Sequence, residues 1–343
     1  MSPNIQTRQL GKNGPQVTAL GFGAMGLSSL LYGATPSDEE RFKVLDRVYD
    51  LGCKFWDTAE GYGDNEELIG KWFSRTGKRD NVFLATKFAV KTGPNGSRVF
   101  CNDPNYIRAA IDISLKRLQT DRVDLWYCHR LDGKVAVETV VSTMAESVKA
   151  GKVKYLGLSE CSSESLRRAC KVHPISTVQI EYSPFTMDIE DPKIALLKTC
   201  RELGVAIVAY SPLGRGLLTG QYKSSADFEE GDWRRTAPRF SAENFPKNLQ
   251  LVDKLGEIAK VKGCTTGQLS LAWLMNQGDD IIPIPGTKKI KYLEENMGAL
   301  NAKLTEKEDN EIRKAVEAAE VHGDRYPGVM QAKCFMDTPP LEA

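Results

Sequence analysis

Four polar residues near the ends of short apolar runs have side chains suited to proton transfer. Asp57 and Lys87 each end such a run, Tyr62 lies in the loop after Asp57, and His129 ends a further run. Taken singly, a buried Asp–Lys pair, a loop tyrosine or a histidine at a strand end is more often structural than catalytic. Placed together on one rim, they would donate a proton to a carbonyl oxygen.

Each of the four residues has a distinct role in that chemistry. The pKa of a phenol is about 10, so Tyr62 alone would be a weak acid at neutral pH. We expect Lys87 to lower this pKa and Asp57 to keep Lys87 charged and oriented. His129 would hydrogen-bond the substrate oxygen. The set offers no nucleophile for acyl transfer and no metal ligands, so no metal site is expected.

The elements that must position these residues are short apolar runs that alternate with amphipathic segments. Runs at 54–57, 82–87, 124–129, 153–159, 177–181, 206–210 and 281–285 are typical of buried parallel strands, and a strand near 18–21 would follow a hairpin turn at Lys12-Asn13-Gly14. A first helical pattern begins after the capping residue Ser37. Further helical patterns cover residues 65–76, 104–118, 134–150, 162–172 and 191–203. Eight such units predict an α/β fold, a (β/α)₈ TIM barrel, with polar strand ends facing the active-site mouth.

An open, doubly wound sheet is the main alternative architecture. It would place a G-x-G-x-x-G turn between its first strand and a helix. Gly21-Phe22-Gly23-Ala24-Met25-Gly26 matches that pattern, but residues 27–34 are loop-like and the next helix begins only near Asp38. The closed barrel is therefore favoured.

Two irregular segments interrupt the alternation. The loop after the seventh strand, residues 214–246, is longer than an ordinary connection, and Trp233, Arg234, Arg235 and Phe240 are candidates to cover the site. The tail at 321–343 is also irregular. We expect residues 1–343 to form a single domain with its core at about residues 8–320.

The composition argues against several classes of protein. Lys and Arg number 46 and Asp and Glu 45 among 343 residues, so nucleic acid is not an expected partner. No apolar run approaches the roughly 18–20 residues that span a bilayer, and the first residues lack a signal-peptide core. The 8 cysteines form no CxxC pair. We expect a reduced, cytoplasmic protein with a small-molecule substrate and no membrane partner, either monomeric or a small homo-oligomer.

Longer motifs resemble those of the aldo-keto reductases. Asp57-Thr58-Ala59-Glu60-Gly61-Tyr62-Gly63 is followed by Asn65-Glu66-Glu67-Leu68-Ile69-Gly70, and the likeness continues at 21–27, 157–159, 178–184, 210–220 and 284–289. It spans roughly residues 8–320 and is greatest to the microbial YakC-type branch. The resemblance implies a (β/α)₈ barrel that uses NADPH without a Rossmann domain. It also implies reduction of aldehydes, and of ketones as well, to alcohols by hydride transfer from the nicotinamide.

The resemblance implies a role for each matching residue. Asp57, Tyr62, Lys87 and His129 would form the catalytic tetrad, with Tyr62 as the acid. Ser159 and Gln179 would hydrogen-bond the nicotinamide carboxamide, and Tyr210 would stack on the ring. The other implied cofactor residues are Gly23 and Met25, then Ser211, Leu213, Gly214 and Gly216 for the pyrophosphate, Gly286, Thr287 and Lys288 for the 2′-phosphate, and Glu295 and Asn296 for the adenine.

One position departs from the family pattern. Many members have Asn after the strand that ends at Ser159, where this chain has Glu160. Glu160 would either lie near the nicotinamide, where its charge would favour the oxidised ring, or point to the surface.

The substrate pocket is expected beside the motif residues. Candidates for its wall are Met25, Tyr32, Trp56, Phe88 and Arg130. An apolar pocket with Arg130 at its edge would suit aryl or medium-sized aldehydes.

Two other functions are compatible with these residues. Some barrels of the family are similar to potassium-channel β subunits, which keep the tetrad and act mainly as cofactor-sensing binding proteins with little turnover. No distinctive interaction segment in this chain favours that function. An isomerase or lyase would instead use Lys87 as a Schiff base, which needs a lowered pKa, whereas the adjacent Asp57 would raise it.

Overall fold

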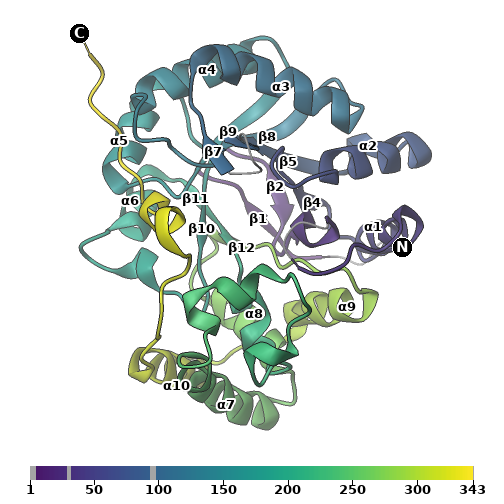
Figure 1. Ribbon diagram of the computed structural model, residues 1–343, viewed down its shortest axis with the longest axis vertical. Coiled ribbons are helices and arrows are strands. Elements are labelled where there is room, and N and C mark those ends of the chain that lie inside the picture. Colours follow the sequence, from purple (N-terminus) through teal and green to yellow (C-terminus); the bar gives the residue numbers. More distant parts are fainter. Residues whose placement is uncertain (1–4, 29–31, 93–97, 343) are drawn as a thin grey trace.

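The structure is a computed structural model that describes residues 5–28, 32–92 and 98–342, and its strands alternate with helices along the chain (Figure 1). The described barrel strands are Phe22–Gly23 (β3), Phe55–Asp57 (β4), Phe83–Phe88 (β5), Val123–Cys128 (β8), Val153–Ser159 (β9), Thr177–Glu181 (β10), Ala206–Tyr210 (β11) and Ile281–Pro283 (β12). All neighbouring pairs are parallel, in the order β3-β4-β5-β8-β9-β10-β11-β12.

Helices surround this sheet (Figure 1). They are Asp38–Asp50 (α1), Asn65–Thr76 (α2), Pro104–Leu118 (α3), Val137–Lys149 (α4), Ser163–Val172 (α5), Leu196–Leu203 (α6), Phe245–Lys262 (α7), Thr266–Asn276 (α8), Ile290–Gly298 (α9) and Glu306–Ala318 (α10). The predicted (β/α)₈ barrel is confirmed.

The sheet closes through the backbone between its first and last strands. The Gly21 N–H donates to the Pro283 carbonyl at 2.9 Å, and the Gly23 N–H donates to the Pro285 carbonyl at 3.2 Å. A Cβ on Gly23 would lie 2.7 Å from the Ile284 carbonyl oxygen, and one on Gly286 would lie 2.3 Å from the Gly23 carbonyl oxygen. Glycine at 23 and 286 is therefore required by the close approach of the two backbones at this seam.

The amino-terminal hairpin closes one end of the barrel. Its strands are Thr7–Gln9 (β1) and Gln16–Thr18 (β2), and the Lys12 N–H donates at 2.7 Å to the carbonyl of Gly204, just before β11. Leu10 and Val17 belong to the apolar cluster that fills the interior, together with Phe55, Ala85, Leu125, Tyr127, Ala206, Val208, Ile282 and Ile284. With the amino end closed, the carboxyl ends of the strands form the mouth.

Most predicted element boundaries lie within two residues of those in the structure, and three elements differ by more. The strand predicted near 18–21 lies later, at Phe22–Gly23, because Thr18 ends the hairpin. The helix predicted from 191 begins at Leu196, since Ala195 has φ 51°, outside the right-handed helical region. The helix predicted at 134–150 covers Val137–Lys149. Residues 29–31 of the loop predicted at 27–34 lie outside the described residues.

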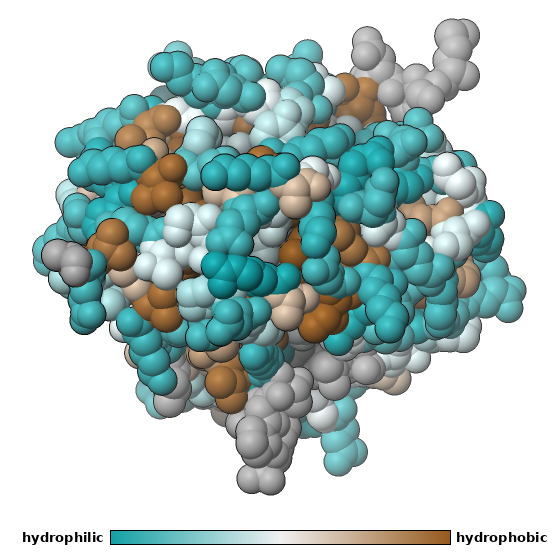
Figure 2. Space-filling model, turned by 90° about the horizontal axis from the view of Figure 1, so that it is seen from above, coloured by the Kyte–Doolittle hydropathy of each residue, from teal (hydrophilic) through white to brown (hydrophobic). Residues whose placement is uncertain are grey.

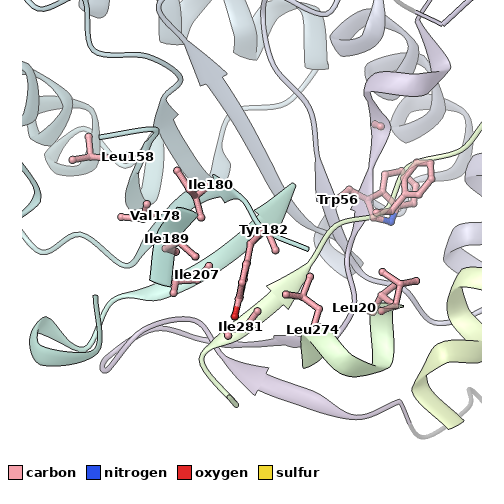
Figure 3. Packing of buried hydrophobic residues seen from close by; sticks show 14 of the residues in the cluster. Leu20, Trp56, Leu158, Val178, Ile180, Tyr182, Ile189, Ile207, Leu274 and Ile281 are labelled. Atoms are coloured by element: carbon pink, nitrogen blue, oxygen red, sulfur yellow. The ribbon is translucent and has the colours of Figure 1, made fainter. Parts of the chain in front are cut away.

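Side chains on the barrel strands alternate between the interior and the layer that faces the helices. Trp56 and Phe88 are fully buried in the helix-facing layer, where Figure 3 shows Trp56 among the packed apolar side chains. The Trp56 ring lies 4.7 Å from that of Trp72, and the Phe88 ring lies 4.6 Å from that of Trp126. The prediction that Trp56 and Phe88 line the substrate pocket is wrong.

The two irregular segments predicted from the sequence pack onto the barrel. The loop after β11 contains four short 3₁₀ segments, Gly214–Thr219, Ser225–Asp227, Trp233–Thr236 and Pro238–Phe240. The tail passes beside α5 (Figure 1), where the Met336 carbonyl accepts from the Ser162 N–H at 2.9 Å.

Most of the surface shown in Figure 2 is hydrophilic, with apolar groups scattered over it. Among the described residues no helix has the length and apolar character needed to cross a membrane.

Candidate active site

Three of the four predicted catalytic side chains form one hydrogen-bonded group at the barrel mouth. Lys87 Nζ lies 2.5 Å from Asp57 Oδ1 and 3.4 Å from Tyr62 Oη, and it also donates to the Thr58 carbonyl at 2.7 Å. Asp57 and Lys87 are almost completely buried. Burial alone would lower the pKa of Lys87, but Asp57 and Tyr62 raise that pKa above its usual value. The ammonium therefore stays charged.

Two opposing effects set the pKa of Tyr62. Burial raises the pKa of Tyr62, and the opposing effect of Lys87 does not overcome it. The negative charge of Asp57 also raises this pKa, because it partly cancels the effect of the positive charge of Lys87 on the phenol. Lys87 lowers the pKa of Tyr62 as predicted, but burial raises that pKa by more, so the net pKa lies above its usual value. Tyr62 is a neutral phenol at neutral pH, which is the form that can donate a proton.

His129 lies beside Tyr62, at the end of β8. The two rings are arranged edge to face, with centroids 5.6 Å apart and planes at 85°. Burial, together with the charges of Lys87 and Arg130, lowers the pKa of His129 well below its usual value. The imidazole is therefore neutral, with one nitrogen able to donate and the other to accept.

The two side chains implied to hold the carboxamide have partners within the site. Gln179 Nε2 donates to Asp57 Oδ2 at 2.7 Å, so Gln179 also orients the Asp57 carboxylate. Ser159 Oγ accepts from Arg130 Nη1 at 3.0 Å. The Ser159 hydroxyl can still donate its proton to another acceptor, and the amide oxygen of Gln179 can still accept from a donor.

Glu160 is fully buried and forms an ion pair with Arg325 of the tail. Its Oε2 accepts from Arg325 Nη2 at 3.0 Å, and its Oε1 accepts from the Tyr210 hydroxyl at 2.7 Å. Burial would raise the pKa of Glu160, but Arg325 and Arg130 hold it below its usual value. The alternative in which Glu160 points to the surface is wrong, and both its oxygens are occupied by side chains of this chain.

A second buried carboxylate extends this network. Glu181 Oε2 accepts from Arg215 Nη2 at 2.8 Å, and Glu181 Oε1 lies 3.4 Å from Arg239 Nη1. The Tyr326 hydroxyl lies 3.0 Å from that of Tyr210. Sequence reasoning did not identify Glu181, Arg239 or Tyr326 as part of the site. The sequence gives little signal for them: residues 214–246 contain four arginines, but Tyr326 is the only tyrosine of the tail and Glu181 lies in a predicted strand.

The loop predicted to bind pyrophosphate has an unusual backbone. Ser211, Gly214, Arg215 and Gly216 have positive φ values of 48°, 54°, 58° and 95°. Within the loop the Gly214 N–H donates to the Ser211 carbonyl, and the Gly216 N–H to that of Leu213. These two N–H groups stabilise the loop itself, so phosphate oxygens would need other donors.

The segment after β12 contacts the loop that precedes α1. Lys288 Nζ donates to the carbonyls of Tyr32 at 2.7 Å and Ala34 at 2.9 Å, which leaves one ammonium proton for a phosphate. Thr287 lies beside Gly26, since a Cβ on Gly26 would be 3.9 Å from the Thr287 backbone. This places the 286–288 segment against the 24–27 segment that contains Met25.

A hollow lies at the position implied for the adenine. Its volume is about 520 Å³, and Glu295, Lys291, Tyr292, Thr219 and Gln221 are among the residues that line it. Asn296, the other implied adenine residue, is 6% exposed.

Two of the remaining pocket candidates lie among the residues of the mouth. Arg130 contacts Ser159, and the Tyr32 ring lies 5.1 Å from the Arg234 guanidinium of the long loop. The Trp233 ring stacks on Tyr326 at 6.0 Å, so the loop and the tail meet here.

The barrel and its mouth define the class of protein. A buried, charged lysine beside a neutral phenol and a neutral imidazole can donate a proton and stabilise the resulting phenolate. In the described residues, no group of three or more His, Cys, Asp or Glu side chains could hold a metal ion. The geometry is that of an acid catalyst at the mouth of a (β/α)₈ barrel.

Comparisons with known proteins agree with this class. The model of the aldo/keto reductase family matches residues 19–317. The aldo-keto reductase str7 of Strobilurus tenacellus is 56% identical over 98% of this chain and 99% of its own length. The aldo-keto reductase yakc [NADP(+)] of Schizosaccharomyces pombe is 53% identical over the same shares. The chain belongs to the aldo/keto reductase family and is an oxidoreductase.

Solved structures show the same fold. A thermostable aldo-keto reductase in complex with the inhibitor epalrestat has a TM-score of 0.72 and 29% identity, with coverage of 91% of this chain and 100% of that one. The glycerol dehydrogenase of Gluconobacter oxydans has a TM-score of 0.81 at 24% identity, with coverage of 91% and 95%.

Proposed function

We propose that the protein reduces aldehydes, and also ketones, to alcohols with NADPH, and that Tyr62 donates the proton. The observation that carries this proposal is the contact of Tyr62 Oη with Lys87 Nζ at 3.4 Å, beside the Asp57 carboxylate. NADPH, when bound, supplies the hydride. Side chains at the barrel mouth bind the substrate oxygen and supply the proton.

The substrate oxygen is bound by Tyr62 and His129 in this proposal. The Tyr62 hydroxyl donates a hydrogen bond to the carbonyl oxygen, and the neutral imidazole of His129 donates a second one. As hydride reaches the carbonyl carbon, charge develops on the oxygen and draws the proton from Tyr62. Lys87 stabilises the phenolate that remains, and Asp57 keeps Lys87 charged and in place.

Several residues suit the cofactor. The Ser159 hydroxyl and the Gln179 amide oxygen are polar groups for a carboxamide, and one ammonium proton of Lys288 suits the 2′-phosphate. The hollow lined by Glu295 suits the adenine. The name of the Schizosaccharomyces pombe relative includes NADP(+), which supports NADPH as the cofactor.

The two alternative functions are less well supported. Lys87 is charged and donates to Asp57, Thr58 and Tyr62, so it has no free electron pair for a Schiff base. A cofactor-sensing binding protein would keep the same residues but would turn over little.

Replacement of Tyr62 by Phe tests the proposal. The Tyr62→Phe variant keeps the shape of the ring and should lose roughly 10²–10⁴-fold in carbonyl reduction, the range for a general acid, while it still binds NADPH. Tyr49→Phe, on α1 and away from the mouth, is the matched control. A Tyr62→Phe variant that keeps more than about a tenth of the wild-type rate would exclude Tyr62 as the acid. A wild-type protein that binds NADPH but reduces no aldehyde would favour the binding function.

A further inference from the structure

One buried cation of the mouth has no anion beside it. Among the described residues, Arg130 is the only buried Lys or Arg side chain without a carboxylate within 4.0 Å. The buried basic residues that do have such a partner are Arg8, Arg41, Lys87, Arg215, Arg234, Arg239 and Arg325. Arg130 itself is 5% exposed.

The contacts of Arg130 are all with neutral groups. Its Nη1 donates to the His129 carbonyl at 2.6 Å and to Ser159 Oγ at 3.0 Å. Its Nε is buried and has no hydrogen-bond partner in the described part of the chain. Its guanidinium carbon lies 6.0 Å from the centre of the Tyr210 ring. Arg130 directly follows His129, and its charge lowers the pKa of both Tyr62 and His129.

Glu160 forms no ion pair with Arg130, although its charge helps to raise the pKa of Arg130. Both carboxylate oxygens of Glu160 accept from Arg325, and Oε1 accepts from the Tyr210 hydroxyl as well. Arg325 thus has Glu160 and, at 3.6 Å, Asp188 as partners, whereas Arg130 has no carboxylate within 4.0 Å in the described residues. An unpaired charge in a water-poor site is unfavourable, so the mouth is built to receive an anion.

The cofactor is not a suitable source of that anion. Its phosphates would lie at the loop after β11 and at Lys288, whereas Arg130 contacts the ends of β8 and β9. The nicotinamide is neutral when reduced and cationic when oxidised. The substrate is the remaining source.

We propose that Arg130 binds an anionic group, a carboxylate, that the substrate carries in addition to its reacting carbonyl. This inference rests on the proposed function. The step itself is unchanged: hydride forms the new C–H bond, the C=O π bond becomes an alkoxide, and Tyr62 protonates it. The carboxylate is not altered and serves to orient the carbonyl toward Tyr62 and His129.

Matched substrate pairs test this role. The 2-, 3- and 4-carboxybenzaldehydes differ from their methyl esters chiefly in charge, and kcat/KM is measured for each pair with NADPH. For at least one isomer, Arg130→Met should lower kcat/KM of the acid about 10–100-fold more than that of the ester, the scale of a lost charged hydrogen bond. Arg130→Lys should restore part of the difference. Arg98→Met, which removes an exposed arginine whose charge also reaches His129, is the control and should leave every acid-to-ester ratio unchanged.

A merely structural role of Arg130 gives a different result. If Arg130 only positions Ser159, acids and esters lose activity by the same factor in Arg130→Met, and the proposal is overturned. Equal ratios in wild type and Arg130→Met for all three isomers overturn it as well.

A binding measurement separates this proposal from the proposed function. Each hydroxymethylbenzoate and its methyl ester are titrated calorimetrically into the NADPH complex, where the alcohol cannot react. The wild type should bind at least one acid about tenfold or more tightly than its ester, and Arg130→Met should lose that preference. If no aldehyde is reduced, the proposed function fails, while the titration still decides whether Arg130 binds the carboxylate. No preference in the wild type overturns the role of Arg130.

Discussion

The buried pair of Glu160 and Arg325 leads to a specific prediction about stability. Glu160 Oε2 lies 3.0 Å from Arg325 Nη2, and the exposed fractions of the two side chains are 0% and 1%. Glu160→Gln keeps the size of the side chain and removes its charge. The Arg325 guanidinium is then left buried with only the more distant Asp188, 3.6 Å from its Nε and 42% exposed.

The expected loss follows from that geometry. Removal of one partner of a buried ion pair costs about 3–5 kcal/mol. For 343 residues the entropy of unfolding is about 0.7 kcal/mol/K. The midpoint of thermal unfolding should therefore fall by about 4–7 °C. Because Arg325 belongs to the tail, we also expect faster proteolysis of the tail in the variant.

A double-mutant cycle separates the pair from other effects. The free energy of unfolding is measured by urea titration for wild type, Glu160→Gln, Arg325→Met and the double variant. The double variant should lose less than the sum of the two single variants, because it leaves neither charge unpaired. A loss below about 1 kcal/mol in Glu160→Gln, or additive losses, would refute the role given to this pair.

Three further predictions concern the cofactor, pH and barrel closure. Lys288→Ala should weaken NADPH binding by about 1–3 kcal/mol and NADH binding hardly at all, and equal weakening in fluorescence titrations would contradict this. Burial raises the pKa of Glu60 to about 7 although the Tyr106 hydroxyl lowers it. Between pH 4.5 and 7 the Glu60 carboxyl therefore keeps its proton in the folded state and loses it in the unfolded state. As the pH rises through this range, the free energy of unfolding of the wild type should fall by up to about 3 kcal/mol relative to that of Glu60→Gln. Parallel pH profiles of the two proteins would contradict this. Gly23→Ala should destabilise the barrel by about 1–3 kcal/mol, and unchanged urea unfolding would show that the seam can relax.

The sequence predicted much of the fold because its strands and helices are locally encoded. The bounds predicted for α2 and α3, 65–76 and 104–118, are those of the structure, and the Ser37 cap of α1 is present. Asp57 and Lys87 were expected to be neighbours because both end adjacent parallel strands, and they pair at 2.5 Å.

Two errors in the pocket could have been avoided by strand periodicity. Neighbouring residues of a strand point to opposite faces. Since Asp57 and Lys87 face the interior, Trp56 and Phe88 must face the helices, as they do. Large aromatic residues beside catalytic ones were instead interpreted as pocket walls.

The buried ion network could not be predicted in this way. Arg325 pairs with Glu160 across 165 positions of sequence, and the tail has no helical or strand period that would fix its path. Likewise, the pKa of Tyr62 depends on how deeply the phenol is buried, which its position after a strand does not determine.

The central claim is that the mouth transfers hydride and proton to a carbonyl through Tyr62. The most direct measurement is a single turnover with NADPH deuterated at both C4 positions and 4-carboxybenzaldehyde methyl ester, with the product examined by NMR. The claim predicts deuterium on the former carbonyl carbon, formed at the rate of NADPH oxidation in wild type and at least about 10²-fold more slowly in Tyr62→Phe. Deuterium-free alcohol, or equal rates in the two proteins, would contradict it.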